Sequence, residues 1–185
     1  MKFFEIIKIC WIVVAVYWIV SSFGTKRTSE RNNPAARALY LFPFVASFLL
    51  LFGAVKLRVE MLAVLRNALI NLIGTIVCCL GVIETVWART TLGRNWSSEP
   101  EFKERHQLIQ TGPYRYTRHP IYTGILVMFL GTALVVGTLE AFLGFTLCFA
   151  AFWIKSRQEE KILSTHFPEY AEYRTRVKAL IPFVF

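Results

Sequence analysis

The sequence predicts an all-α integral membrane protein with about five transmembrane helices. Hydrophobic residues make up 55% of the chain, and the mean hydropathy of +0.47 is too high for an ordinary soluble domain. The 16 phenylalanines and five tryptophans suit lipid-facing and interfacial surfaces. Apolar stretches near the length that crosses a bilayer, roughly 20 helical residues, alternate with polar connections. We therefore expect residues 1–185 to form one integral-membrane domain.

The charged and reactive residues exclude several classes of protein. The net charge of +9 is spread between the apolar stretches, which favours contact with membrane lipids over binding of nucleic acid. The four cysteines lie in apolar stretches and are interpreted as small buried hydrophobic residues. The three histidines show no ligand spacing, so we expect no metal site. The sequence also contains no phosphate-binding glycine loop and no Gly-x-Ser-x-Gly nucleophile.

Five apolar spans follow one another along the chain. Their approximate limits are 3–23, 39–57, 61–89, 121–136 and 139–154. No small-residue cleavage site follows the first span, so we expect it to be retained rather than removed as a signal peptide. The third span exceeds what a bilayer needs, and tilt or protrusion would absorb the excess. Only Gly137-Thr138 separates the last two, which predicts an antiparallel hairpin, with a short re-entrant hairpin as the alternative.

Glycines recur every seven residues in two of these spans. Gly74 and Gly81 fall on one helical face of the third span, and Gly124 and Gly131 repeat the spacing in the fourth. Small residues on one face let two helix backbones approach closely. The pattern therefore predicts close helix packing.

The basic residues predict the orientation of the chain. The polar segments 24–38, 89–119 and 155–185 hold four, six and six lysines and arginines, which is 16 of the 21. With five crossings all three segments lie on one side, and the positive-inside tendency makes that side cytoplasmic. A count of four or six crossings would divide them. We therefore expect the N-terminus outside and the C-terminus in the cytoplasm.

The last membrane helix is expected to continue beyond Ile154 until Pro168 stops it. Tyr170 and Tyr173 then begin a helical spacing that predicts a short amphipathic helix. The apolar end of the chain, 180–185, is expected to fold back on the membrane.

A polar, aromatic loop leads into the fourth span. Pro113 and Pro120 lie seven residues apart and argue against one continuous helix. Arg118 and His119 therefore sit on a shaped loop at the end of a membrane helix. A loop this rich in hydrogen-bond donors, beside lipid, indicates an anionic or strongly polar ligand.

Lys155 and Glu159 lie on the same side of the membrane as this loop. They are four residues apart, hence on one helical face and about 6 Å apart along the axis. Spacing alone allows an ordinary juxtamembrane charge cluster. It also allows a site in which two carboxylates and several cations hold a zwitterionic ligand.

Two blocks of sequence carry a family resemblance. The first contains His106-Gln107-Leu108-Ile109, Gly112-Pro113-Tyr114 and Arg118-His119-Pro120-Ile121-Tyr122. The second contains Glu159-Glu160, Leu163, Phe167, Tyr170, Tyr173, Val177 and Ile181-Pro182-Phe183. These blocks, at this separation, resemble the isoprenylcysteine carboxyl methyltransferase family. The resemblance covers roughly residues 90–185, whereas the first two spans resemble only generic membrane helices.

The resemblance implies a membrane enzyme that uses S-adenosyl-L-methionine, with N-terminal helices over 1–60 and a methyltransferase core over 61–185. It places the cofactor pocket on the cytoplasmic side. The pocket residues implied by position are His106, Gln107, Leu108, Ile109, Tyr114, His119, Pro120, Ile121, Tyr122, Glu159 and, as a further candidate, Glu99. The lipophilic acceptor would enter from the bilayer, and a prenylcysteine-like carboxylate is the family's best-known one. Phospholipid or fatty amines and small thiols are the alternatives.

Three residues are candidates for acting on the acceptor. Arg118 is expected to orient it, with Glu160 in support. Lys155 stands where the best-matching members carry an arginine that faces the substrate, so the charge is kept but the bidentate geometry is lost, and Arg157 is a substitute. A carboxylate acceptor is already ionised at neutral pH and needs no general base. An amine acceptor would instead make Glu159 or Glu160 a base candidate.

Two interpretations of other classes remain beside the methyltransferase. One is an NADPH-dependent reductase of the sterol type, whose C-terminal helices look broadly similar. The other is a non-catalytic membrane adaptor. A response to S-adenosylhomocysteine but not to NADPH would distinguish the methyltransferase from both.

Overall fold

Helices dominate the computed structural model, which describes residues 2–23, 28–31, 34–53, 67–96, 101–103 and 108–182. The all-α class is confirmed. The helices are α1 (Lys2–Ser22), α2 (Pro34–Leu51), α3 (Ala68–Leu92), α4 (Pro120–Val136), α5 (Leu139–His166) and α6 (Tyr170–Arg176). Two 3-10 turns, η2 (Gly93–Asn95) and η3 (Gly112–Arg115), lie between α3 and α4. The strands β1 (Thr28–Arg31) and β2 (Glu101–Lys103) pair antiparallel, which the sequence did not predict because both are short and polar.

Within the described residues, α1, α2, α3 and α5 are long and apolar enough to cross a membrane. The chain is therefore an integral membrane protein. Helix α4 is apolar but has only 17 residues. At 1.5 Å per residue this is about 26 Å, slightly less than the roughly 30 Å of a bilayer's hydrocarbon core. The predicted fourth span, 121–136, thus corresponds to the shortest of the apolar helices.

The limits of two predicted spans differ from the helices observed. Helix α2 begins at Pro34 rather than at residue 39, because proline is well suited to a helix's first turn. It ends at Leu51 rather than at 57, and Gly53 follows with a φ of 73°. Helix α3 begins at Ala68 after Asn67, whose side chain accepts a hydrogen bond from the Leu69 backbone nitrogen. Residues 54–66, where the predicted third span starts, lie outside the described ones.

The glycines bring α3 and α4 into backbone contact at the centre of the bundle. A Cβ atom on Gly131 would lie 2.5 Å from both the Cys78 nitrogen and the Gly74 carbonyl oxygen. A Cβ atom on Gly81 would lie 2.6 Å from the carbonyl oxygen of Gly124. Real Cβ atoms do not come this close, so the two glycine faces pack directly against each other. The predicted close packing is confirmed.

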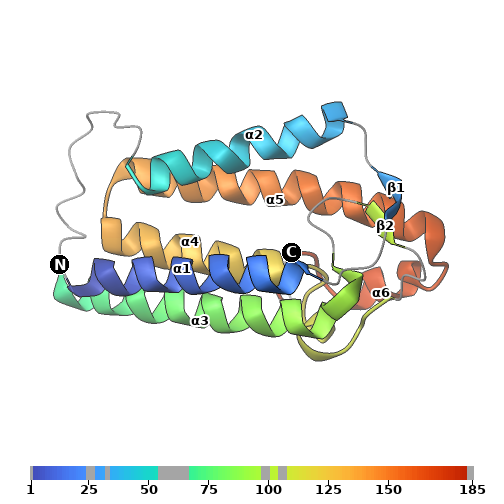
Figure 1. Ribbon diagram of the computed structural model, residues 1–185, viewed down its shortest axis with the longest axis horizontal. Coiled ribbons are helices and arrows are strands. Elements are labelled where there is room, and N and C mark those ends of the chain that lie inside the picture. The colour runs from blue at the N-terminus through green and yellow to red at the C-terminus, as the bar shows by residue number, and fades with distance from the viewer. Residues whose placement is uncertain are drawn as a thin grey trace.

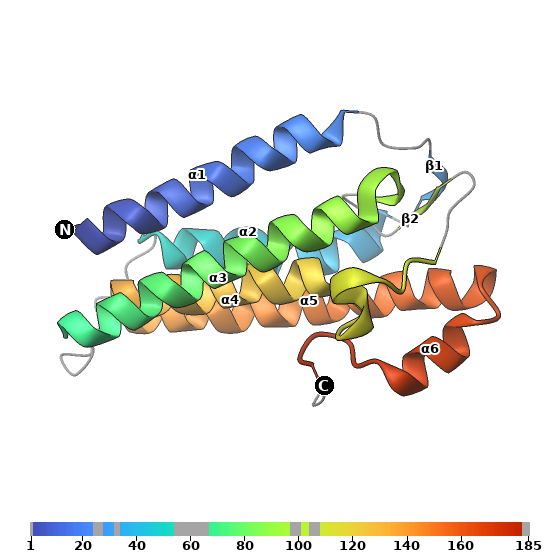
Figure 2. The ribbon, with the colours of Figure 1, turned by 90° about the horizontal axis from the view of Figure 1, so that it is seen from below.

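The other helices surround this pair. Helix α2 lies along α5, and α1 packs on α3 and also contacts α4 (Figures 1 and 2). Aromatic rings join α1, α2 and α4, because Trp11, Phe48 and Phe129 contact one another with centroids 4.9 to 5.4 Å apart. These edge-on contacts are typical of a packed aromatic core.

Helices α4 and α5 form the predicted hairpin. Gly137 takes a left-handed conformation and donates its backbone N–H to the Ala133 carbonyl at 2.8 Å, which ends α4. The Thr138 hydroxyl then accepts from the Ala141 nitrogen and begins α5. Helix α5 continues well past Ile154 and ends at His166, two residues before Pro168, as expected.

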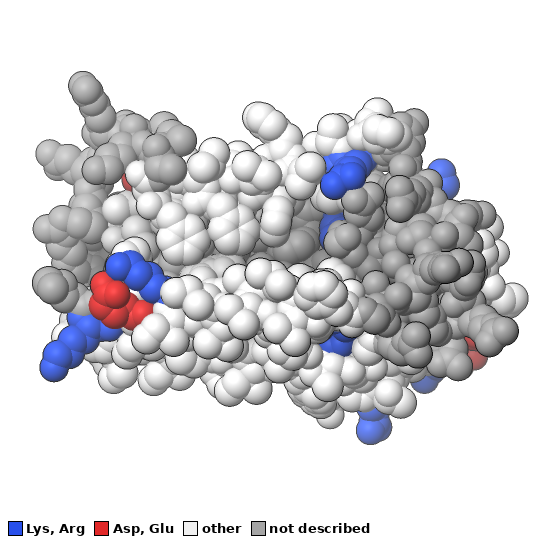
Figure 3. All heavy atoms as spheres, in the orientation of Figure 1, with Lys and Arg blue, Asp and Glu red and all other residues white. Residues whose placement is uncertain are grey.

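Because α1 to α5 alternate in direction, the described parts of the three basic segments lie at one end of the bundle. Figure 1 shows β1, β2 and α6 together at this end, opposite the α4–α5 turn. Figure 3 shows charged atoms toward both ends of one face, with an uncharged band between them. A band of this kind matches the apolar interior of a bilayer.

Candidate functional site

The site loop runs from Thr111 to His119 and is shaped by glycine and proline. Gly112 has a φ of 59°, which suits glycine, and Pro113 enters the 3-10 turn η3. Pro120 is the first residue of α4, where a missing N–H costs nothing. The prediction that the two prolines interrupt the helix is confirmed.

Tyr114 fixes this loop to two helices. Its hydroxyl contacts the Ala88 carbonyl of α3 at 3.5 Å, and its own carbonyl accepts a 2.6 Å hydrogen bond from the Tyr173 hydroxyl of α6. Burial raises the pKa of Tyr114 well above its usual range, so its phenol stays neutral. Tyr114 therefore acts here as a neutral anchor.

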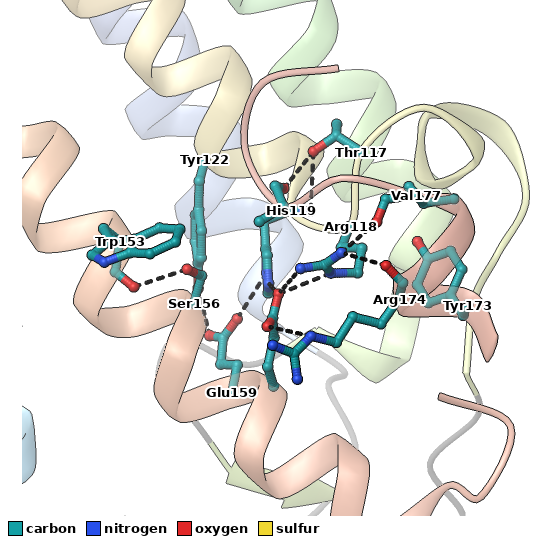
Figure 4. A network of polar contacts seen from close by, with 12 residues as sticks. Thr117, Arg118, His119, Tyr122, Trp153, Ser156, Glu159, Tyr173, Arg174 and Val177 are labelled. Carbon is teal, nitrogen blue, oxygen red and sulfur yellow. Dashed lines mark hydrogen bonds and ion pairs between the residues drawn. The ribbon is translucent and has the colours of Figure 1, made fainter. Parts of the chain in front are cut away.

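His119 lies between two adjacent carboxylates of α5, Glu159 and Glu160. Figure 4 shows the imidazole beside Glu159. Its Nδ1 is 3.4 Å from an oxygen of Glu159, and its Nε2 is 3.3 Å from an oxygen of Glu160. The site loop and the second sequence block thus meet at one side chain, as expected. Only a protonated imidazole donates from both nitrogens, so this geometry favours the imidazolium.

The surroundings of His119 act on its pKa in opposite directions. Burial lowers the pKa of His119, but the hydrogen bonds and charges of Glu159 and Glu160 outweigh burial and raise it above the usual value. The imidazolium is therefore stabilised to a higher pH than that of a free histidine.

Glu159 is the more accessible of the two carboxylates. Its side chain is 20% exposed, compared with 5% for Glu160. The Tyr122 hydroxyl donates a hydrogen bond to one oxygen of Glu159, and His119 lies near the other. A carboxylate has about four acceptor positions, so these contacts leave Glu159 able to bind a ligand.

Aromatic rings form one wall beside Glu159. The ring of Tyr122 stacks on His119 on one side and on Phe152 on the other, with centroids 5.4 and 4.5 Å apart. Lys155 places its Nζ 5.2 Å from the Tyr122 ring and 5.5 Å from the ring of Tyr40 in α2. The wall therefore combines π faces with a cation held by cation–π contacts.

Arg118 lies on the other side of Glu160 and is nearly buried. Its Nε and Nη2 donate to one Glu160 oxygen at 2.9 and 2.7 Å. Its Nη1 donates to the carbonyls of Arg174 and Val177. Arg174 approaches the other oxygen of Glu160 at 3.9 Å. Glu160 is thus surrounded by Arg118, Arg174 and His119.

The structure brings many of the predicted pocket residues to one end of the bundle. Pro120, Ile121 and Tyr122 are buried in the first turn of α4. Leu108 packs on the cluster of Tyr170, Tyr173 and Val177, and Ile109 packs on the main core. His106, Gln107 and Glu99 lie outside the described residues. The roles predicted for all these residues stay predictions.

Three groups at this end of the bundle could not be identified as part of the site from the sequence alone. Tyr40 comes from α2, which resembles only a generic membrane helix. Arg174 comes from α6, and the carbonyl of Val177 carries no side-chain pattern. Among the residues that the structure describes, no group of three or more His, Cys, Asp or Glu side chains is suited to a metal ion.

Known proteins resemble this chain in sequence and in fold. A family model described as phospholipid methyltransferase matches residues 69–170, more than half of the chain. The probable protein-S-isoprenylcysteine O-methyltransferase of Oryza sativa subsp. indica is 29% identical over 119 residues, which are 62% of this chain and 62% of that protein. The protein-S-isoprenylcysteine O-methyltransferase of Saccharomyces cerevisiae is 32% identical over 124 residues, 65% of this chain and 52% of that protein. The chain thus spans less than two thirds of these relatives.

A solved structure shares the fold. The eukaryotic intramembrane Ras methyltransferase ICMT (isoprenylcysteine carboxyl methyltransferase) matches with a TM-score of 0.54 and 22% identity, over 84% of this chain and 55% of that one. At this identity the match concerns the fold alone. The family model and the relatives in sequence confirm the predicted family resemblance.

Proposed function

Because the chain belongs to the phospholipid methyltransferase family, we propose that it transfers a methyl group from S-adenosyl-L-methionine to a lipophilic acceptor at the membrane. The observation that carries the proposal is the meeting of His119 and Glu159 at 3.4 Å, at one end of an apolar helix bundle. A charged pocket next to lipid suits a reaction between a polar donor and an apolar acceptor. The polar end of the bundle then faces the cytoplasm.

The side chains at this end fit the chemistry of that cofactor. S-adenosyl-L-methionine carries an ammonium and a sulfonium, and both cationic groups call for an anionic partner. Glu159 offers a partly exposed carboxylate beside the aromatic wall of Tyr122, His119 and Phe152. When bound, the cofactor supplies an already activated methyl group.

In this proposal the chain contributes binding and positioning. Glu159 binds a polar part of the cofactor, while Tyr122 and His119 hold that carboxylate in place. Ordered groups of this kind lower the barrier by alignment and exclusion of water. No proton needs to be removed from an acceptor that is already ionised.

The acceptor that we favour is a prenylcysteine-like carboxylate. The base candidates for an amine acceptor, Glu159 and Glu160, both face the imidazolium of His119, and this cation makes each carboxylate a weaker base. Lys155, held between two tyrosine rings, is the cation that we assign to the acceptor carboxylate. The names of the rice and yeast relatives support the same class of substrate.

Cofactor binding tests the proposal directly. Purified protein in detergent should gain thermal stability with S-adenosylhomocysteine and none with NADPH. Glu159→Gln should weaken S-adenosylhomocysteine binding by about tenfold, or 1.4 kcal/mol, because the charge is lost while the side-chain shape is kept. Glu172→Gln, at an exposed position of α6, is the matched control and should bind normally.

A stabilisation by NADPH alone would favour the reductase, and no response to either compound would favour the adaptor. A second assay, with labelled S-adenosyl-L-methionine and a panel of prenylcysteines, lipid amines and thiols, identifies the acceptor. Methylation of an amine but not of a prenylcysteine would refute the carboxylate assignment.

A further inference from the structure

We propose that Arg118 is a positioning residue that fastens the C-terminal strap, residues 177–182, as a wall of the cofactor site. This inference rests on the proposed function, because it concerns the site that would hold S-adenosyl-L-methionine. It assigns Arg118 a task different from orienting the acceptor. It also gives the end of the described chain a place against the site loop rather than on the membrane surface.

The donors of Arg118 already have partners within the protein. Nε and Nη2 bind the buried carboxylate of Glu160, and Nη1 binds two carbonyl oxygens, those of Arg174 and Val177. The side chain is only 8% exposed. A guanidinium has five N–H donors in a rigid fork, and here the fork is directed at α5 on one side and at the start of the strap on the other. An acceptor would have to compete with these contacts for the guanidinium.

The strap is bound to the site loop along its length. The Arg118 nitrogen donates to the Lys178 carbonyl at 2.8 Å, and the His119 nitrogen donates to the Ala179 carbonyl at 3.1 Å. The Thr123 hydroxyl donates to the Leu180 carbonyl at 2.6 Å. Thr117 and Lys178 also form a parallel β-bridge. The strap therefore runs beside the loop and is joined to it by an isolated β-bridge.

The packing of the strap supports the same role. Leu180 is fully buried in the main core cluster, together with Tyr122 and Phe152. Val177 packs against Tyr170 and Tyr173 of α6. A segment anchored by buried Val177 and Leu180, with backbone hydrogen bonds between them, is a fixed part of the fold.

This arrangement connects Arg118 to the residues that would hold the cofactor. The strap binds the backbone of His119, and the imidazole of His119 holds Glu159 and Glu160. Arg118 also binds Glu160 directly. Loss of the Arg118 side chain would loosen the start of the strap and remove a partner of Glu160, and both changes reach Glu159 through His119. Arg118 therefore acts on the cofactor through other groups.

The test compares four variants of the full-length protein. Arg118→Ala removes the fastening, and Arg118→Lys keeps the charge but only part of the fork. Thr123→Val removes one strap bond and leaves Arg118 in place, which keeps the test decisive if Arg118→Ala folds poorly. Arg115→Ala, an exposed arginine of the same loop, is the control. Each is measured for hydrogen exchange of residues 177–182 without cofactor, for S-adenosylhomocysteine affinity, and for kcat and KM.

Arg118→Ala should accelerate exchange of the strap and weaken S-adenosylhomocysteine binding by about tenfold, with kcat at saturating cofactor changed by less than about threefold. Arg118→Lys should restore part of the affinity, and Thr123→Val should show the same two effects on a smaller scale. Arg115→Ala should match the wild type. A fall in kcat or a rise in acceptor KM in Arg118→Ala, with unchanged cofactor affinity and unchanged exchange, would overturn the proposal.

Failure of the proposed function can be distinguished from failure of the fastening by Arg118. If the wild type binds no S-adenosylhomocysteine, the proposed function and the wall assignment fall, whatever the exchange shows. If the wild type binds it but exchange of the strap is the same in Arg118→Ala as in the wild type, only the fastening by Arg118 is refuted.

Discussion

His119 acquires its chemistry from neighbours that are forty residues away in the sequence. Glu159 and Glu160 are adjacent on α5, and successive side chains on a helix point about 100° apart. They can share one partner only if it lies between them, as the imidazole of His119 does. The same contact balances two neighbouring negative charges that would otherwise repel each other. A histidine in this position is an electrostatic link between two helices.

The protonation of His119 should make the protein's stability depend on pH. Its pKa is raised in the folded protein, because the two carboxylates outweigh the burial that lowers it. The contribution of the imidazolium is therefore fully present below the unfolded pKa, about pH 6.5, and is lost as pH rises through the folded pKa. The melting temperature in detergent should fall over this window in the wild type. His119→Gln should remove most of that fall.

His166→Gln provides the control for this measurement. His166 lies at the end of α5 and contacts the Ile162 carbonyl through Nδ1. The variant should keep the pH dependence of the wild type. An equal slope in His119→Gln and in the wild type would show that the carboxylates do not hold a charged imidazole.

At the scale of the elements, local signals were sufficient for the helices and insufficient for the contacts between chain segments. The α4–α5 hairpin followed from a two-residue link, and the end of α5 followed from Pro168. The limits of α2 were missed because an apolar run does not mark the proline at which the helix begins. A sequence pattern therefore locates a helix more reliably than it locates the residues at which the helix begins and ends.

Some contacts of the candidate site could likewise be predicted from the sequence, and others could not. The two motif blocks predicted that His119 and Glu159 lie together, because both emerge at the same end of the membrane helices. The contact of Arg118 with Val177 could not be predicted, because it ends on a carbonyl group that every residue possesses. Tyr40 also escaped prediction, since its helix packs on α5 through contacts that only the folded bundle creates. Sequence motifs thus identified the side chains of the site but not the groups that hold these side chains in place.

The glycine faces of α3 and α4 lead to a prediction about packing. A Cβ atom on Gly131 would lie 2.5 Å from two backbone atoms of α3, which cannot move aside as a side chain could. Gly131→Ala should therefore force the two helices apart and destabilise the protein by about 1–3 kcal/mol. Thermal unfolding in detergent measures the effect. Leu80→Ala, on the exposed side of α3, is the control and should change stability much less.

At the scale of the whole molecule, the described parts of the three basic segments lie at the same end of the bundle as the candidate site. The segments that contain 16 of the 21 lysines and arginines lead to and from this end. The opposite end carries the α4–α5 turn and the start of α1 (Figure 1). The positive-inside tendency orients such a molecule with its basic end in the cytoplasm. That orientation would give the site direct access to a soluble cofactor.

Cysteine labelling tests this orientation. Arg176→Cys places a thiol on exposed α6, and Glu5→Cys places one on the exposed first turn of α1, at the other end. In intact cells a membrane-impermeant maleimide should label Glu5→Cys but not Arg176→Cys, and Arg176→Cys should react only after permeabilisation. The wild type is the blank, because its cysteines lie within the apolar helices. The reverse pattern would place the site on the outer side, where a cytoplasmic methyl donor could not reach it, so the orientation and the proposed reaction would fail together.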